Sequence, residues 1–165
     1  VVEISISTRP DCINAEYLEA IIGFIKEKRS EVNVSLELGL QTVNYHTLEK
    51  CRRKHTLAEF IDAVLTAQKY NIEIGVHLIL NLPGDDFLDV KENAKVLSAL
   101  GVDNVKLHAL YIREGTLFGE KYKKGELSVI SMEEYIERVT AFLEYLDPRP
   151  HPFQLRTEAP NPTGR

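Results

Sequence analysis

The sequence predicts an α/β protein built as a partial, incomplete TIM-like β/α barrel with parallel strands. Four segments alternate apolar and polar residues, segments of helical period separate them, and the polar residues of all four could share one interior. Strands covered on both faces of a doubly wound sheet tend instead to be continuously apolar. The chain has 165 residues. A complete barrel of about 250 residues has eight units, so this length holds about five.

The predicted strands cover residues 2–7, 35–41, 75–81 and 104–109. In each strand one alternate set of side chains is apolar and is expected to pack on helices, as Ile4 and Ile6 would in the first. The other set is largely polar and is expected to line a shared interior. Such an interior on parallel strands indicates a barrel lumen that holds water or a ligand.

Helical periodicity predicts four longer helices between and after these strands. Three of them have an N-cap or a capping box as start signal: Asn14, Thr56 with Glu59, and Ser131 with Glu134. The remaining helix begins near Phe87 and stops near Gly101. Two shorter helices are expected at about residues 45–52 and 116–123.

Two parts of the chain are distinguished by composition. Residues 1–146 are predicted to form the barrel core, and residues 147–165 a proline-rich C-terminal extension in which 153–156 could form a short strand. The first residues already have the pattern of a strand and no initiator methionine, so we expect a fragment.

Composition excludes several classes of protein. Cys12 and Cys51 are too few for a disulfide framework or a zinc site with three or four thiolates. The net charge of −5 argues against a general nucleic-acid scaffold. The chain has no apolar run of about 20 residues and no leader, so a cytoplasmic protein without membrane contact is expected. The common phosphate-binding and nucleophile motifs are also absent.

Five segments, in this order and spacing, resemble the radical S-adenosylmethionine (radical SAM) enzymes. They are residues 7–11 (STRPD), 37–42 (ELGLQT), 53–56 (RKHT), 78–84 (LILNLPG) and 106–108 (KLH). The sequence is similar to a bacterial group known as YhcC-like iron-sulfur oxidoreductases. It is more distantly similar to the radical SAM domain of the Elongator acetyltransferase and to oxygen-independent coproporphyrinogen oxidase. The resemblance covers about residues 1–127.

The resemblance implies a partial barrel with a 4Fe-4S cluster on a CxxxCxxC loop, and SAM cleaved reductively to a 5′-deoxyadenosyl radical. That motif is absent from this chain, and the number and spacing of Cys12 and Cys51 do not suit a cluster held by three thiolates. We therefore expect a fragment that is inactive alone and contributes no metal ligand. SAM and the cluster would both be bound by the full-length parent.

The resemblance also implies roles for five residues in binding SAM. Gln41 would contact the ribose, and Arg53 would pair with the carboxylate through its planar fork of donors. Ser7 stands where many relatives have a glutamate for the SAM amino group, and His77 stands where an aspartate contacts the ribose. Asn81 opens a loop expected near the adenine.

Further polar residues lie on the interior face of the predicted strands or just after their ends, where barrel enzymes place their sites. We take these as candidates for substrate binding: Arg9, Asp11, Glu37, Lys106, His108 and Tyr111. Structural explanations remain open for most of them. Residues 8–11 could be only a turn, the histidines could be hydrogen-bonded structural groups, and Glu37 and Lys106 could neutralise each other.

Three functions remain open. The first is a radical SAM enzyme acting on a small molecule or a tRNA. The second is a non-catalytic barrel that binds a nucleotide or an RNA nucleoside, and the third is a small complete α/β domain with solvated polar strand faces. If the first strand lies at a sheet edge, its unpaired backbone groups also predict self-association.

Overall fold

The computed structural model describes residues 3–27, 32–147 and 155–157. It contains one parallel sheet of five strands in the order β1-β2-β3-β4-β5. The strands are β1 (Glu3–Thr8), β2 (Asn33–Gln41), β3 (Glu73–Ile79), β4 (Asn104–His108) and β5 (Leu155–Thr157). Each crossover leads to the adjacent strand, which is the winding of a β/α barrel.

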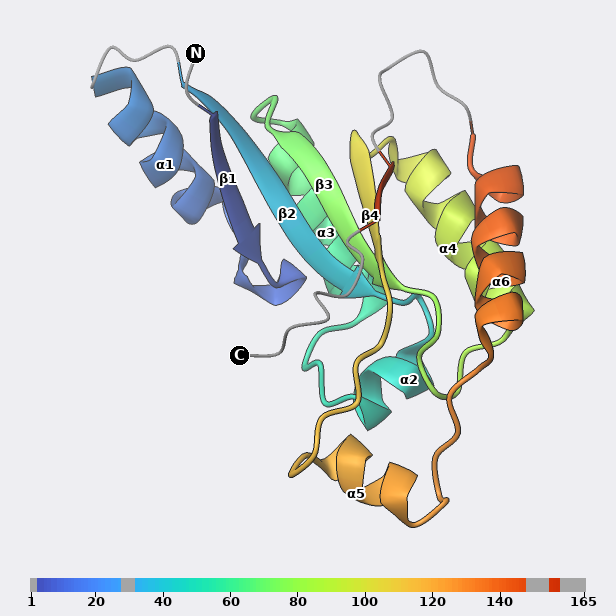
Figure 1. Cartoon of the computed structure of the whole chain (residues 1–165). Helices are drawn as coiled ribbons and strands as arrows, with labels where there is room; N and C mark the ends of the chain where they lie inside the picture. Colours follow the sequence, from blue (N-terminus) through green and yellow to red (C-terminus); the bar gives the residue numbers. More distant parts are fainter. Residues whose placement is uncertain (1–2, 28–31, 148–154, 158–165) are drawn as a thin grey trace.

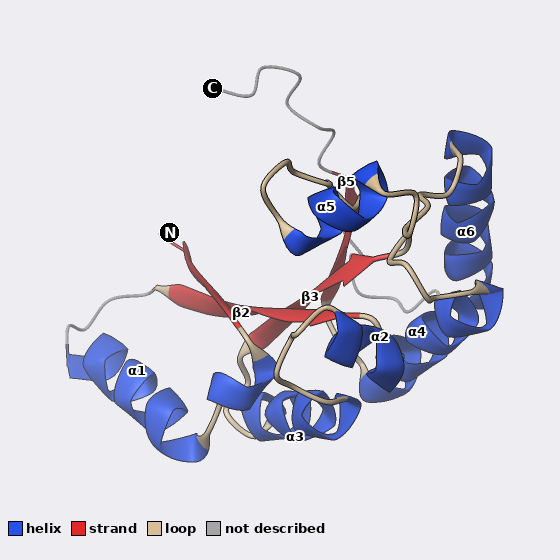
Figure 2. Cartoon of the chain, turned by 90° about the horizontal axis from the view of Figure 1, so that it is seen from below, coloured by secondary structure: helices blue, strands red, loops and turns tan. Residues whose placement is uncertain are grey.

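The long helices lie along one side of this sheet, as Figure 2 shows. They are α1 (Ala15–Glu27), α3 (Leu57–Gln68), α4 (Phe87–Leu100) and α6 (Met132–Tyr145). The short helices are η1 (Pro10–Cys12), α2 (Tyr45–Lys50) and α5 (Leu117–Lys123), and all three lie toward the carboxyl ends of the strands (Figure 1). The predicted partial β/α barrel is therefore confirmed, with the opposite side of the sheet as its interior.

The core lies between the sheet and the long helices. Alternate residues of the three central strands are buried there: Leu36, Leu38, Leu40, Ile74, Val76, Leu78, Val105 and Leu107. Burying each such side chain stabilises the fold by about 1.5 to 3 kcal/mol. Ile6 packs against this core, but the prediction that Ile4 would also do so was wrong, since 43% of Ile4 is exposed. Among the described strands, the strand that carries Ile4 has a neighbour on one side only.

The predicted helix starts are confirmed, with one correction. Asn14 Oδ1 accepts from the Tyr17 amide at 2.8 Å, and Thr56 caps α3 in a complete capping box with Glu59. Ser131 Oγ accepts from the Glu134 amide at 3.2 Å, but the Glu134 carboxylate does not return to the N-cap. It accepts from Arg138 instead, because a buried guanidinium one turn further along is the stronger partner.

The C-terminal extension is described at Asp147 and at β5, which pairs in parallel with β4 and overlaps the predicted short strand at residues 155 and 156. The remaining part of the extension, residues 148–154 and 158–165, lies outside the described residues. The domain boundary at residues 146 and 147 stays a prediction. In the part of the chain that the structure describes, no helix combines the length and the apolar character needed to cross a membrane.

We expect the outer edge of β1 to mediate self-association, or β1 to be displaced. Within the described residues β1 pairs only with β2, so its other edge presents unpaired amide and carbonyl groups. Replacing Ile4 with lysine should reduce association, because a charged edge strand discourages pairing. Light scattering over a dilution series measures the effect.

Leu65→Lys, at an exposed position of α3, is the matched control and should leave association unchanged. A monomer at every concentration, with the amides of residues 3–7 protected from hydrogen exchange, would contradict the expectation.

Candidate functional site

Four polar side chains from three strands meet on the interior face of the sheet. Glu37 Oε1 accepts from Lys106 Nζ at 2.8 Å, and Glu37 Oε2 lies 2.8 Å from His77 Nε2. His77 Nδ1 lies 2.7 Å from His108 Nε2. The register of β3 and β4 brings these side chains together. Lys106 lies beside His77, and His108 lies beside Ile79, two residues after His77. We call these four residues the interior network.

Gly75 makes room for the carboxylate at the centre of this network. It lies beside Glu37 in the register of β2 and β3. A Cβ atom at this position would stand 2.5 Å from Glu37 Oε2 and 2.8 Å from Glu37 Cδ. Any larger residue would therefore displace the carboxylate from Lys106 and His77.

Glu37 is ionised in this setting. Burial acts to raise its pKa, but the hydrogen bonds and positive charge of Lys106, together with those of His77, outweigh burial and hold the pKa below its usual range. An ionised carboxylate has no proton to donate, so Glu37 Oε2 accepts a hydrogen bond from the Nε2–H group of His77. When both rings are neutral, His77 Nδ1 then accepts from His108 Nε2, so the network has a defined direction of hydrogen bonding.

A second group of polar side chains lies at the end of β2. A Cβ atom on Gly39 would stand 2.8 Å from Gln41 Nε2 and 3.0 Å from Arg53 Nη2, so both side chains cross this glycine. Arg53 Nη2 donates to the Gly39 carbonyl at 3.2 Å, whereas Arg53 Nε is buried and has no hydrogen-bond partner among the described residues. Burial and the nearby charge of Arg9 lower the Arg53 pKa. We call Gly39, Gln41 and Arg53 the Arg53 group.

The loop that presents Arg53 has a strained backbone. Arg52 and Lys54, on either side of it, have φ angles of 53° and 59°, and Gln41 has a φ of 71°. For residues other than glycine, such left-handed conformations cost on the order of 1 to 2 kcal/mol each. The buried His55 ring holds the loop in place, with one nitrogen 3.2 Å from the Leu40 carbonyl and the other 3.3 Å from the Arg53 carbonyl. Strain of this kind clusters at binding sites.

Other predicted site residues lie outside these two groups. Arg9 and Asp11 form an ion pair with each other at 2.6 Å around η1, and Ser7 is exposed. Asn81 is buried and accepts from the Leu110 amide at 2.7 Å, which joins the loops after β3 and β4. Tyr111 lines a separate hollow between α2 and α5.

One buried carboxylate was missed by the sequence analysis. Asp85 is 8% exposed, and its Oδ1 atom has no hydrogen-bond partner within the described residues. Burial raises its pKa, and the hydroxyl groups of Thr47 and Thr42 offset part of that effect. No motif marks this aspartate, which directly precedes Asp86, the N-cap of α4.

The described residues fit the two implied cofactors differently. The unsatisfied Nε donor of Arg53 and the adjacent amide of Gln41 suit a ligand with a carboxylate and hydroxyl groups. No set of three or more His, Cys, Asp or Glu side chains is placed to hold a metal ion in residues 3–27, 32–147 and 155–157. Cys12 and Cys51 are free thiols, so these residues do not fit an iron-sulfur cluster.

Replacing Glu37 with glutamine should destabilise the fold by about 1 to 3 kcal/mol at neutral pH, because charge-assisted hydrogen bonds to Lys106 and His77 are weakened. Folding lowers the pKa of Glu37. The ionised carboxylate therefore stabilises the fold fully at a pH above the pKa of the unfolded state, and this stabilisation is lost as the pH falls through the pKa of the folded state. The difference between wild type and variant should therefore shrink below the usual glutamate range. Urea unfolding across a pH series measures it.

Glu92→Gln is the matched control, since it removes the same charge from an exposed pair with Lys95 and should cost about 0.5 kcal/mol or less. Equal losses for the two variants would show that the interior network contributes no more than a surface pair.

The comparisons with known proteins agree with this architecture. The sequence matches the family model of the radical SAM superfamily over residues 1–97 and that of the radical SAM C-terminal domain over residues 102–161. The uncharacterized protein MJ0486 of Methanocaldococcus jannaschii is 35% identical over 148 residues, which are 90% of this chain and 45% of that protein. Protein YhcC of Escherichia coli is 28% identical over 163 residues, which are 99% of this chain and 52% of YhcC. The chain thus spans about half the length of these relatives.

Solved structures show the same fold. The archaeal Methanocaldococcus infernus Elp3 superimposes with a TM-score of 0.75 at 25% identity, over 95% of this chain and 35% of that one. Coproporphyrinogen III oxidase from Escherichia coli superimposes with a TM-score of 0.66 at 18% identity, over 87% of this chain and 31% of the oxidase. Complete enzymes of this family use SAM and a 4Fe-4S cluster. With the family matched over more than half of its length, the chain belongs to the radical SAM superfamily.

Proposed function

We propose that the chain is the SAM-binding part of a radical SAM enzyme that cleaves SAM to a 5′-deoxyadenosyl radical in the complete protein. The observation that carries this proposal is the half-buried Arg53 guanidinium with an unsatisfied Nε donor. Arg53 forms no ion pair with a carboxylate among the described residues, so a ligand can supply one.

The residues of the Arg53 group have the chemistry that SAM requires. A guanidinium binds a carboxylate through two parallel hydrogen bonds, and Arg53 keeps donors available beyond the one on the Gly39 carbonyl. The Gln41 amide can donate to and accept from ribose hydroxyl groups. Together these side chains would bind and orient SAM, which supplies the radical when it is bound beside a reduced cluster.

The cluster itself must come from elsewhere in this proposal. The described residues contain no suitable group of thiolates, so thiolates outside this chain would hold it, and the chain alone would be inactive. We also propose that the complete enzyme works in the cytoplasm.

The interior network provides a site for the substrate. Glu37 and Lys106 are mostly buried but lie on the face of the sheet opposite the core, where they could contact a polar substrate together with His77 and His108. Relatives include a tRNA uridine(34) acetyltransferase, 30% identical over 84% of this chain, and the heme chaperone HemW. We therefore propose a tRNA or a small molecule as substrate.

Replacing Arg53 with alanine should weaken SAM binding about tenfold or more, since a hydrogen bond to a charged group contributes about 1.5 to 3 kcal/mol. Arg53→Lys should give an intermediate loss, because lysine keeps the charge but not the fork of donors. Calorimetric titration of the chain with SAM measures both.

Lys69→Ala removes an exposed charge at the other end of α3 and should leave SAM affinity unchanged. If Arg53→Ala bound SAM as tightly as this control, Arg53 would be a solvated charge and the proposed function would lose its main support.

A further inference from the structure

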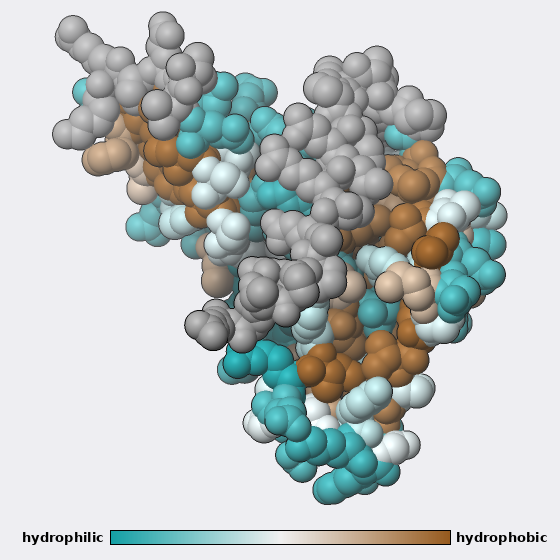
Figure 3. All heavy atoms as spheres, viewed as in Figure 1, coloured by the Kyte–Doolittle hydropathy of each residue, from teal (hydrophilic) through white to brown (hydrophobic). Residues whose placement is uncertain are grey.

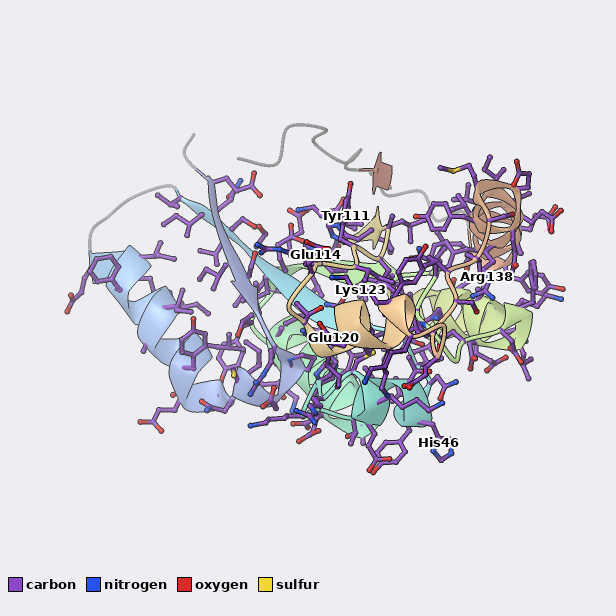
Figure 4. The ribbon with its side chains drawn as sticks, turned by 60° about the horizontal axis from the view of Figure 1, so that its bottom comes forward. His46, Tyr111, Glu114, Glu120, Lys123 and Arg138 are labelled. Atoms are coloured by element: carbon purple, nitrogen blue, oxygen red, sulfur yellow. The ribbon has the colours of Figure 1, made fainter. Side chains whose placement is uncertain are left out.

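A hollow of about 310 Å³ lies between the end of α2 and the segment that leads into α5. Its lining includes three cations, two aromatic rings and a hydroxyl: Lys50, Arg52, Arg113, Tyr111, Phe118 and Thr116. The helices α2 and α5 lie at the carboxyl ends of the strands (Figure 1), and Figure 4 shows Tyr111 near the end of β4, next to α5. In Figure 3, hydrophobic surface borders the hydrophilic surface of this region.

No carboxylate neutralises the three cations within the part of the chain that the structure describes. Lys50, Arg52 and Arg113 form no ion pair among the described residues, and the lining contains no carboxylate. The nearby Glu114 carboxylate pairs with Lys123 at 2.9 Å, on α5 itself (Figure 4). In a chain of net charge −5, three unpaired cations around one hollow form a local site for an anion.

Two of the cations lie on stretches of backbone with a distinctive geometry. Arg52 follows α2 with a φ of 53°, a conformation that glycine adopts without strain, so the turn itself does not explain an arginine there. The Arg113 carbonyl accepts from Thr116 Oγ1 at 2.7 Å and occupies the place where a Cβ atom of Gly119 would lie. The backbone of Arg113 is therefore held against the start of α5.

We propose that this hollow binds a nucleoside phosphate, either a free mononucleotide or one nucleotide of an RNA strand. Arginine side chains bind phosphate oxygens through their forked donors, and aromatic rings such as Tyr111 and Phe118 stack on bases. The volume suits a small ligand. SAM carries a net positive charge, so three unpaired cations disfavour it here. The proposal thus does not depend on SAM binding at the Arg53 group.

The test is a calorimetric titration of the chain with uridine 5′-monophosphate, inorganic phosphate and a short oligouridine, each at low ionic strength. Uridine is used because it lacks the adenine that SAM carries. Uridine monophosphate should bind more tightly than phosphate, since the rings add stacking. Arg113→Gln and Arg52→Gly should each weaken its binding about tenfold. Arg52→Gly should also keep or raise the melting temperature, which separates a binding role from a structural one.

Lys69→Gln, with the same change in charge at the C-terminal end of α3 and away from the hollow, should leave nucleotide binding unchanged. Tighter binding of the oligonucleotide than of the mononucleotide would identify an RNA strand as the source, and equal affinities a free nucleotide. The proposal is overturned if none of the probes binds, if phosphate binds as tightly as the nucleotide, or if Lys69→Gln weakens binding as much as Arg113→Gln.

Discussion

The buried carboxylate of Glu37 is the constraint on which the rest of the interior depends. An ionised group that is 8% exposed costs several kcal/mol unless charges and hydrogen bonds compensate it. Here the compensation comes from Lys106 on β4 and His77 on β3, and Gly75 leaves the space for it. A shift of either strand by one residue would turn these partners to the other face. The polar interior therefore helps to fix the register of the three central strands.

The same alternation separates stability from chemistry in this sheet. Leucine and valine side chains on one face pack under the long helices, while the other face holds the interior network and the Arg53 group. Both polar groups use strand positions whose side chains point away from the core, because successive side chains of a strand point to opposite faces. Substitutions in either group therefore leave the packing of the core side chains in place. The carboxyl ends of the strands then bring these groups to one edge, where loops can add further ligand contacts.

The sequence predicted the parts of this structure that follow from local rules. Strand alternation predicts Glu37 and Lys106 on one face, where they form an ion pair, and capping signals at Thr56 predict the start of α3. Contacts between residues far apart in the sequence could not be predicted from these local rules. Periodicity does not show that Ile4 lies at a sheet edge, or that Tyr111 lines a hollow apart from the interior network. Left-handed φ angles at arginine and lysine also contradict residue preference, so no sequence rule predicts them.

These left-handed residues explain how one short loop can serve two sites. Arg53 crosses Gly39 on the interior face, whereas its neighbour Arg52 lines the hollow beside α5. Successive side chains of a regular helix point about 100° apart, and a reversal of backbone handedness between them separates them further. The reversal costs free energy, which the Arg53 amide, bonded to the Leu48 carbonyl at 3.0 Å, and the buried His55 ring offset. Because both arginines depend on the same anchors, the geometry of the two sites is coupled through the loop that carries them.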